Sequence, residues 1–374
     1  AGAGNDDVLG GDGSDRIDTG LFTDGQGTEF VDGGADRDIA STRGEFLVGR
    51  SAFDDLDPNN TANTADDVDQ LSGGAGDDLL IVSGSNSAAE QDGLNDVQQF
   101  ETVRLQSGTF DFTIGNNSVF ETDHDARVAA AGTDGMTTID GRFANLPVDV
   151  DASTLDEAIT LWGGTNDDEL IGGRGNDTID GDANGDNNSD GGDDKLLGGA
   201  GDDTFITSAN ALDGGDTIEG DSGDDTIVIS AEGGRTNGVA ASNGNAAEIN
   251  GNVNGIQTIK VEDDGTTNEG DLTINFTGFS NTGDANATTH DTPFELAGTD
   301  DTRLIVDGSD MGVGEDLTVN MAGNGFDEDI EVRGGAGNDT LNMGAWLDSG
   351  DVFAAGAGFD TVQISDSQTG DFTN

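Results

Sequence analysis

The sequence contains no cysteine, which excludes a disulfide framework and thiolate metal sites. It also lacks any apolar run near the roughly 18 residues of a membrane-spanning helix. No signal peptide opens the chain, and its first residues, from Ala1 to Asp6, already lie inside a repeat. We therefore expect a fragment or a mature piece of a longer protein, with no membrane span.

Basic residues are scarce as well. The chain has 13 Lys and Arg against 77 Asp and Glu, a formal net charge of −64, and Asp is about four times as common as Glu. This charge disfavours nucleic acid and anionic membranes as partners. With a hydrophobic content of 32%, an apolar core alone cannot easily overcome the repulsion and the chain entropy. We therefore expect bound cations, and the short Asp carboxylate suits a hard divalent ion held in a tight turn.

A nine-residue pattern, Gly-Gly-x-Gly-x-Asp-x-apolar-x, repeats along the chain. One of the complete copies has Asp221 in place of the second glycine. The complete copies span 10–18, 73–81, 172–180, 198–206, 220–228 and 334–342. Degenerate copies span 1–9, 163–171, 189–197, 211–219 and 355–363. Because several copies follow one another without a gap, the pattern predicts a fold built from stacked repeat units.

Each unit has a direct physical interpretation. Its glycines allow the tight turn that β-branched residues cannot follow. Its last three residues, such as Thr178, Ile179 and Asp180, form a short strand with one side chain pointing inward. Stacked strands bury a thin apolar column, and stacked turns bring Asp carboxylates and backbone carbonyls together. Such an oxygen-lined site suits Ca²⁺, which accepts about six to eight oxygen ligands at flexible geometry.

The motif resembles the RTX, or hemolysin-type calcium-binding, repeat of Gram-negative bacterial proteins. The resemblance implies a right-handed parallel β-roll, several Ca²⁺ ions between turns, and type I export of an unfolded chain that folds outside the cell. It also accounts for the missing cysteine, because members of this family generally lack it. Carried onto this sequence, the resemblance makes the sixth-position aspartates calcium ligands: Asp6, Asp15, Asp78, Asp168, Asp177, Asp194, Asp203, Asp216, Asp225, Asp339 and Asp360.

Another candidate metal site lies between two of these repeats. Asp180, Asp182 and Asn184 carry side-chain oxygens at alternate positions, with Gly185 next, as at the start of an EF-hand loop. Its twelfth position holds Gly191 instead of the usual Glu. The segment is therefore either a further Ca²⁺ site or an acidic insertion.

A strand-like repeat fills the space between the nonapeptides. The segment 155–164 matches 326–335 without a gap, and 97–105 matches 253–261. Their alternation of polar and apolar residues is typical of half-buried strands. Further short strands are predicted at 109–114, 272–276, 303–307 and 317–321.

We therefore predict an all-β fold, a right-handed parallel β-solenoid in which RTX blocks alternate with wider, irregular β-helical coils. Separate β-sandwich modules between the blocks are the alternative, and the direct junction of 159–161 with Gly163 favours a continuous solenoid. The expected organisation is a first block with an acidic insertion at 1–81, a spacer at 82–162, a central block at 163–228, a second spacer at 229–333 and a last block at 334–374.

The sequence offers no catalytic motif. His124 and His290 lie far apart, and neither has a Cys or a second His nearby. The chain contains neither G-x-S-x-G nor H-E-x-x-H, and no G-K-[ST] follows its glycine-rich loops. We therefore expect a protein that is not an enzyme.

Among RTX proteins, the alternation of blocks and spacers most resembles the bacterial S-layer and large surface-protein branch. We expect an extracellular structural protein of a surface layer, filament or matrix, which folds and self-associates through Ca²⁺. Cell-surface polysaccharide is a further candidate partner. One alternative is an adhesin stalk, whose modules are usually of fixed length. The other is the repeat region of a secreted enzyme or toxin, which normally follows a catalytic or membrane-active segment.

Overall fold

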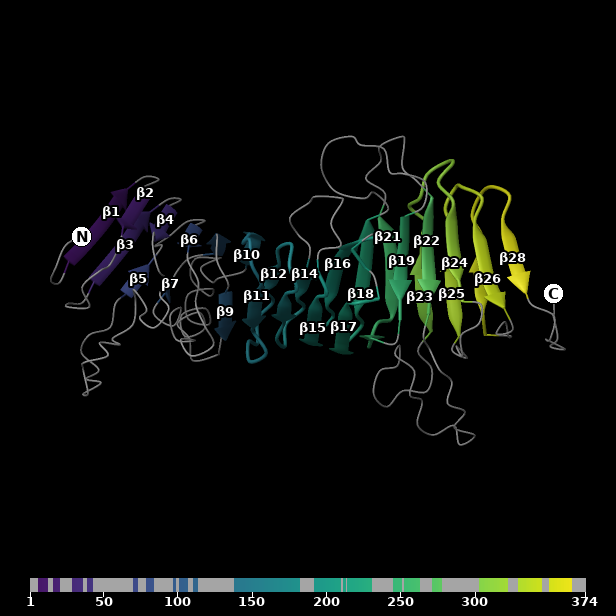
Figure 1. The fold of residues 1–374 in the computed structure, drawn as a ribbon, viewed down its shortest axis with the longest axis horizontal. Coiled ribbons are helices and arrows are strands. Elements are labelled where there is room, and N and C mark those ends of the chain that lie inside the picture. Colours follow the sequence, from purple (N-terminus) through teal and green to yellow (C-terminus); the bar gives the residue numbers. More distant parts are fainter. Residues whose placement is uncertain are drawn as a thin grey trace, which may run out of the picture. The chain divides into compact units, whose positions relative to one another are not determined.

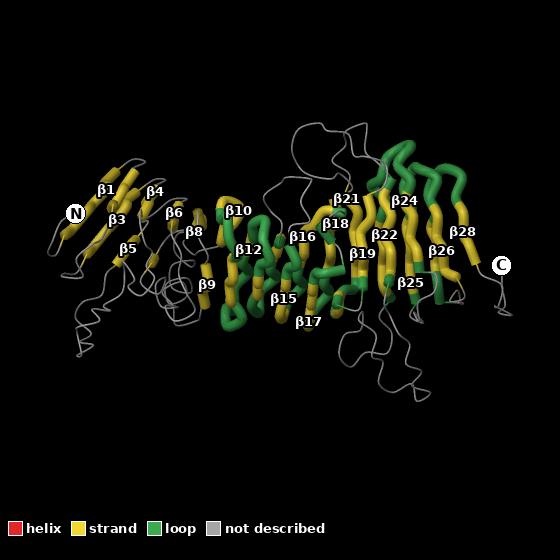
Figure 2. The backbone as a smooth tube through the Cα atoms, in the orientation of Figure 1, coloured by secondary structure: helices red, strands yellow, loops and turns green. Residues whose placement is uncertain are grey.

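The computed structural model describes residues 6–12, 16–20, 29–35, 39–42, 70–72, 79–83, 97–98, 101–106, 110–113, 138–181, 192–209, 211–212, 214–230, 245–250, 252–262, 271–277, 303–321, 329–344 and 350–364. Within these ranges the chain forms strands, turns and bends, and no residue is helical (Figure 2). This part of the chain consequently holds no helix that is long and apolar enough to cross a membrane. The prediction of an all-β fold is confirmed.

The chain divides into two compact units, Ala1–Asp177 (unit 1) and Thr178–Asn374 (unit 2). The boundary falls inside the predicted central block at 163–228. The five-part organisation drawn from the sequence stays a prediction.

Unit 1 consists of short strands that alternate between stacked parallel sheets. One sheet has the order β1-β3-β5-β7, a second contains β2-β4-β6-β8-β10-β12, and a third contains β9-β11-β13. Consecutive strands enter different sheets, so each coil adds one strand to each wall, as in a β-solenoid. The strands are β1 (Asp6–Asp12), β2 (Arg16–Gly20), β3 (Glu29–Ala35), β4 (Ile39–Thr42), β5 (Gln70–Ser72), β6 (Leu79–Ser83), β7 (Val97–Gln98), β8 (Thr102–Gln106), β9 (Phe110–Thr113), β10 (Thr138–Phe143), β11 (Val148–Asp151), β12 (Thr160–Trp162) and β13 (Glu169–Ile171).

Unit 2 is built in the same way. One wall contains β14-β16-β18-β21-β23-β25-β27, and the other contains β15-β17-β20 and then β19-β22-β24-β26-β28, all in parallel pairs (Figure 1). Its strands are β14 (Thr178–Asp180), β15 (Lys195–Ala200), β16 (Thr204–Ser208), β17 (Thr217–Ser222), β18 (Thr226–Ser230), β19 (Asn245–Ile249), β20 (Val253–Asn254), β21 (Thr258–Glu262), β22 (Leu272–Phe276), β23 (Leu304–Asp307), β24 (Leu317–Asn320), β25 (Ile330–Arg333), β26 (Thr340–Gly344), β27 (Val352–Ala354) and β28 (Thr361–Ile364).

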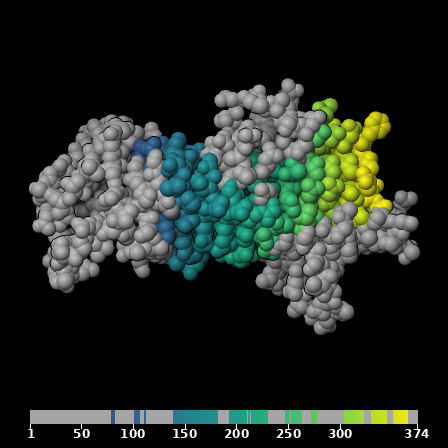
Figure 3. All heavy atoms as spheres, in the orientation of Figure 1, coloured from purple at the N-terminus to yellow at the C-terminus, as the bar shows by residue number. Residues whose placement is uncertain are grey.

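The core of unit 2 is a set of apolar columns. In the first wall, neighbouring strands place one fully buried side chain directly above the next, along the column Ile179, Phe205, Ile227, Ile259, Val306 and Val332. The opposite wall has a matching column of Ala247, Ile274, Val319 and Leu341. Successive coils of this unit therefore lie against one another in chain order, and the colours in Figure 3 change in bands from green to yellow. These columns contain the inward apolar side chain that the sequence predicts for each nonapeptide.

The greater width predicted for the spacer coils stays a prediction, because nonapeptide strands such as β18 are as long as the spacer strand β22. In β22, three side chains point inward and are buried, whereas Thr178–Asp180 contributes one apolar side chain, Ile179. The strands predicted at 272–276, 303–307 and 317–321 correspond to β22, β23 and β24 within a residue at each end. Because these strands pair in parallel with strands of the nonapeptide coils, the spacer of unit 2 continues the solenoid. The described strands of this spacer do not form a separate β-sandwich module.

Candidate metal centres

In unit 1, the sixth-position aspartates hold the backbone of the coil before them. Asp168 accepts a hydrogen bond from the Val148 N–H at 2.7 Å through Oδ1 and another from the Gly164 N–H at 2.6 Å through Oδ2. Asp177 makes the same two bonds, to an N–H of the preceding coil at 2.8 Å and to the second glycine of its own repeat at 2.6 Å. Both side chains are buried. Each carboxylate therefore links two coils.

The aspartates of unit 2 form the same link. Oδ1 of Asp225 accepts the N–H of Asp203 at 2.8 Å, and Oδ1 of Asp339 accepts a strand N–H one coil earlier at 2.8 Å. Asp216 accepts the N–H of Asp194, and Asp360 accepts that of Asp339, each at 3.0 Å. Since neighbouring parallel strands lie about 4.8 Å apart, this stacking brings the carboxylates of each wall into a row, and consecutive repeats contribute to alternate walls.

In two of these carboxylates one oxygen is buried and accepts no hydrogen bond of normal geometry from a described residue: Oδ2 of Asp225 and Oδ2 of Asp339. The Gly335 N–H nevertheless lies close enough to Asp339 to lower its pKa. Oδ2 of Asp225 lies against Gly220, where a Cβ would collide both with that oxygen and with the carbonyl oxygen of Gly255. Asp339 is placed in the same way against Gly334. Glycine thus leaves room for a carboxylate oxygen and a carbonyl oxygen to converge, which is the donor chemistry of a calcium site.

The electrostatics of these turns disfavour the charged carboxylates. Burial raises the pKa of Asp168 to about 7, although two backbone hydrogen bonds act in the opposite direction. Burial also raises the pKa of Asp225 to about 6, and the neighbouring carboxylates of Asp202, Asp224 and Asp221 raise it further. The pKa values of Asp177 and Asp339 shift upward for the same primary reason, burial. A bound cation would reverse these shifts, because it stabilises the charged form.

A second ladder of side chains, at the fifth position of the repeat, was not expected from the sequence. Oδ1 of Asp202 accepts the N–H of Asp224 at 3.0 Å, one coil further along. Oδ1 of Asp316 likewise accepts the N–H of Asn338 at 2.6 Å, and Oδ1 of Asn338 accepts that of Phe359 at 3.0 Å. The fifth-position side chain thus bonds forward along the solenoid, whereas the sixth-position Asp bonds backward. The recurrence of Asp or Asn at position five was the signal that could have revealed it.

The row of carboxylates is interrupted in the spacer coils. After Asp225 the first wall has Gln257, whose Oε1 accepts the N–H of Asp225 at 2.5 Å, and the register then places Leu304 and Ile330 in the row. On the other wall, the residue stacked before Asp339 is Leu317. Apolar side chains therefore occupy the position of the carboxylate in these spacer coils, which removes the carboxylate ligand from the row there.

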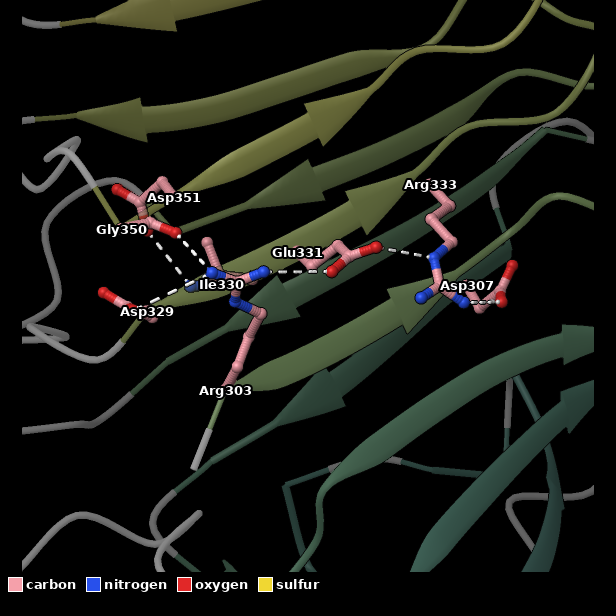
Figure 4. Close-up of polar contacts among 8 residues, drawn as sticks. All are labelled: Arg303, Asp307, Asp329, Ile330, Glu331, Arg333, Gly350 and Asp351. Atoms are coloured by element: carbon pink, nitrogen blue, oxygen red, sulfur yellow. Dashed lines mark hydrogen bonds and ion pairs between the residues drawn. The ribbon is translucent and has the colours of Figure 1, made fainter. Parts of the chain in front are cut away.

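The protein supplies its own cations on the outer face of the same coils. Arg333 donates to Glu331 and to Asp307, both at 2.8 Å, and Arg303 donates to Glu331 at 3.2 Å and to the carbonyl oxygen of Gly350 at 3.0 Å (Figure 4). This network connects β23, β25 and the segment before β27. Hydrogen bonds from Arg333 and Arg303 lower the pKa of Glu331. Two arginines thus neutralise carboxylates that a metal ion would otherwise have to neutralise.

The structure describes most of the predicted ligands. The buried ones are Asp168, Asp177, Asp180, Asp194, Asp203, Asp216, Asp225 and Asp339. Asp360 joins the row but is only half-buried. Asp6 lies in β1, where the backbone alone is described, and Asp15, Asp78, Asp182 and Asn184 lie outside the described residues. The alternative interpretations of the loop after Asp180 therefore stay open.

The described residues fit calcium, but in a particular way. They contain no group of three or more Asp, Glu, His or Cys side chains that could hold a metal ion by themselves. A Ca²⁺ ion in these turns would therefore take backbone carbonyls for most of its ligands and a carboxylate oxygen such as Oδ2 of Asp225 or Asp339 for its charge. Uncompensated buried carboxylate oxygens and converging carbonyls meet this requirement.

Parallel solenoid coils joined by glycine-rich, carboxylate-bearing turns define a β-roll of the calcium-binding type. A family model, the RTX calcium-binding nonapeptide repeat, matches residues 1–25, 59–86, 160–187, 188–211, 210–228 and 331–345, which is less than half of the chain. These segments include every complete nonapeptide found in the sequence. RTX repeats bind Ca²⁺ and are typical of secreted proteins. Comparison with curated proteins found no match, and neither did comparison with solved structures.

Replacing Asp225 by Asn is expected to remove calcium binding at this turn and to stabilise the metal-free protein. Asn keeps the Oδ1 acceptor for the N–H of Asp203 and removes a buried charge whose pKa burial raises to about 6. Calorimetric titration would show fewer bound Ca²⁺ ions, and circular dichroism in EGTA would show a larger residual β signal than the unsubstituted chain gives, because one buried charge fewer opposes folding.

The matched control is Asp156→Asn. Asp156 is half-exposed and pairs with Arg174 at the surface. Because such exposed pairs contribute little to stability, Asp156→Asn is expected to change neither the number of bound Ca²⁺ ions nor the β signal in EGTA. If Asp225→Asn binds as many calcium ions as the unsubstituted chain, with the same affinity, Asp225 is not a ligand.

Proposed function

We propose that this chain is an extracellular, calcium-dependent structural protein of a surface layer, filament or matrix, like the S-layer branch of RTX proteins, and not an enzyme. The observation that carries the proposal is the row of buried carboxylates between coils, with the oxygens of Asp225 and Asp339 left for a cation. The excess of negative charge in the whole chain, −64, agrees with it. Calcium in these turns would be a structural component of the fold.

The distribution of the repeats favours a structural role over the tail of an enzyme or toxin. Segments that match the RTX repeat begin at residue 1 and recur to residue 345, and coils of spacer lie between them. In unit 2, the spacer strands pair directly with the nonapeptide strands, so both kinds of sequence build one continuous solenoid. Such a rod suits an assembly better than it suits a tail attached to a catalytic domain.

The calcium supply would decide where the chain folds. Extracellular modules typically bind Ca²⁺ with dissociation constants of about 0.1–1 mM, far above the calcium concentration inside cells. Before export, carboxylates such as Asp168 and Asp225 would stay without a cation, and their repulsion and burial would oppose folding. Outside, each bound ion supplies positive charge between two coils. Folding and assembly are then coupled to secretion.

A calcium titration from a chelated start tests this function. Circular dichroism would follow folding and sedimentation velocity would follow assembly, with electron microscopy at the end point. We expect folding first and then periodic arrays or filaments. Folded particles that stay monomeric at high protein and calcium concentrations would contradict the proposed assembly and would favour a stalk, especially if they bind cell-surface polysaccharide.

A further inference from the structure

Unit 1 carries a compact group of arginine and aromatic side chains on the sheet that contains β8, β10 and β12. Arg104 lies on β8, Asp140, Arg142 and Phe143 lie on β10, and Trp162 lies on β12. The strands place Arg104 beside Asp140, and Asp140 beside Trp162. We call these residues the arginine patch. It holds two of the 13 basic residues of the whole chain.

One buried carboxylate holds both arginines in place. Oδ1 of Asp140 accepts the Arg142 Nε–H at 2.8 Å, and Oδ2 accepts an Arg142 Nη–H at 3.1 Å and the Arg104 Nε–H at 3.0 Å. The side chain of Asp140 is 1% exposed. Burial alone would raise the pKa of Asp140, but these hydrogen bonds lower it. The carboxylate therefore stays charged and fixes the two guanidinium groups side by side. Because these side chains are already ordered, little further side-chain entropy is lost when a ligand binds them.

The aromatic rings lie beneath the arginines. The guanidinium carbon of Arg142 is 3.9 Å from the centre of the Trp162 ring, and that of Arg104 is 4.6 Å from the centre of the Phe143 ring. Both arginines remain about one-third exposed, at 34% and 30%. Because Arg142 covers the Trp162 ring, stacking of a sugar on that face is disfavoured. The accessible chemistry is that of two guanidinium groups, which bind carboxylates in two-point contacts.

We infer that the arginine patch is a docking site for the carboxylates of a second copy of this chain. The chain bears 77 acidic residues, so another copy is a ready source of carboxylates. Electrostatic interactions reach only about 8 Å at physiological ionic strength, so two acidic copies can approach where opposite charges meet locally. Exposed Phe143, 50% accessible, adds apolar area at the edge of the contact.

The fifth-position row of unit 2 has the geometry to fill this site. Asp202 and Asp224 are exposed and lie on neighbouring coils, because Oδ1 of Asp202 accepts the N–H of Asp224. Parallel neighbours place such side chains about 4.8 Å apart. Arg104 and Arg142 also extend from neighbouring strands, β8 and β10. Two carboxylates at strand spacing thus meet two guanidinium groups at strand spacing.

This inference rests on the proposed function, because it locates one contact of the assembly. The test uses the full chain in calcium and compares sedimentation velocity for the triple variant Arg104→Gln, Asp140→Asn, Arg142→Gln with that for Arg174→Gln. Both changes make the net charge one unit more negative, and the triple variant leaves no buried charge without a partner. We expect the triple variant to associate at least tenfold more weakly and the control to associate as the unsubstituted chain does.

The partner side is tested by Asp202→Asn with Asp224→Asn. This double variant lowers the general repulsion between chains, so non-specific association would become tighter. The inference predicts the opposite, association at least fivefold weaker, when both proteins are compared at a calcium concentration that saturates each of them. Unchanged or tighter association of this variant would exclude the row as the occupant.

Trp162 reports on the patch even if the triple variant folds poorly. Trp346→Phe leaves Trp162 as the only tryptophan in the chain, and its emission is expected to change with protein concentration in parallel with sedimentation. If the chain assembles while Trp162 emission and the triple variant stay unaffected, the inference is wrong and the proposed function stands. A chain that never associates overturns both. A response of Trp162 to added neutral polysaccharide, without a response to protein concentration, assigns the patch to glycan binding and overturns the inference.

Discussion

Chelating calcium with EGTA at pH 7.5 and low ionic strength is expected to unfold the nonapeptide coils. The far-UV β signal and the cooperative thermal transition should both be lost, and added Ca²⁺ should restore them. Buried carboxylates such as Asp168 and Asp225 resist ionisation in the folded protein without metal, as their raised pKa values show. At pH 7.5 they are nevertheless mostly ionised, so folding without a cation must keep negative charges buried close together.

The expected size of this effect is large. A ligand present at 100 times its dissociation constant stabilises the folded state by about 2.7 kcal/mol for each independent site. Several such sites together equal the whole stability of an ordinary domain, about 5–15 kcal/mol. Loss of all ions at once should therefore leave little or no folded population of these coils.

Sodium chloride and Mg²⁺ provide the controls. Sodium chloride screens the repulsion but does not ligate, and Mg²⁺ requires a stricter octahedral geometry than irregular carbonyl sites offer. Both should restore much less structure than Ca²⁺ does. A chelated protein that keeps its β signal and its thermal resistance at low ionic strength would show that the carboxylate row needs no metal.

In the absence of calcium, acidification is expected to stabilise the protein. The pKa is about 7 for Asp168 and about 6 for Asp225, both raised mainly by burial from the usual 3.8. Between pH 4 and 7 the folded state therefore binds more protons than the unfolded state. The stabilisation is fully present below the unfolded pKa and is lost as the pH rises through about 6 and 7. In EGTA the far-UV β signal and the cooperative thermal transition should therefore be absent at pH 8 and return at least in part at pH 5.

With calcium the dependence on pH should be reversed. Protons compete with Ca²⁺ for the carboxylates, so acid weakens binding and lowers the thermal midpoint of the loaded protein. The two curves, measured between pH 5 and 8, should approach each other at the acidic end. Asp225→Asn should flatten the metal-free curve, because it removes one of the titrating groups. A metal-free protein that loses stability steadily from pH 8 to pH 5 would contradict the assignment of these buried carboxylates.

The nonapeptide coils and the spacer coils differ in how their carboxylates are neutralised. In the nonapeptides, carboxylates such as Asp225 enter the row between coils and call for a bound ion. In the spacer of unit 2, Leu304, Ile330 and Leu317 occupy the row, and Arg303 and Arg333 neutralise the carboxylates outside. We therefore expect the spacer coils to depend less on calcium than the coils on either side of them.

The sequence by itself determined the solenoid, the identity of the repeat and the sixth-position aspartates, because glycine turns and single inward side chains are local features with a strict period. It also placed the spacer strands at 272–276, 303–307 and 317–321 within a residue. Only the tertiary structure decided which atoms meet across coils. The forward ladder from Asp202 to Asp224, the place of Leu317 before Asp339, and the bond from Arg104 to Asp140 join residues 22 to 36 positions apart. Such contacts depend on the number of residues in each coil, and a local pattern does not contain the register that this number sets.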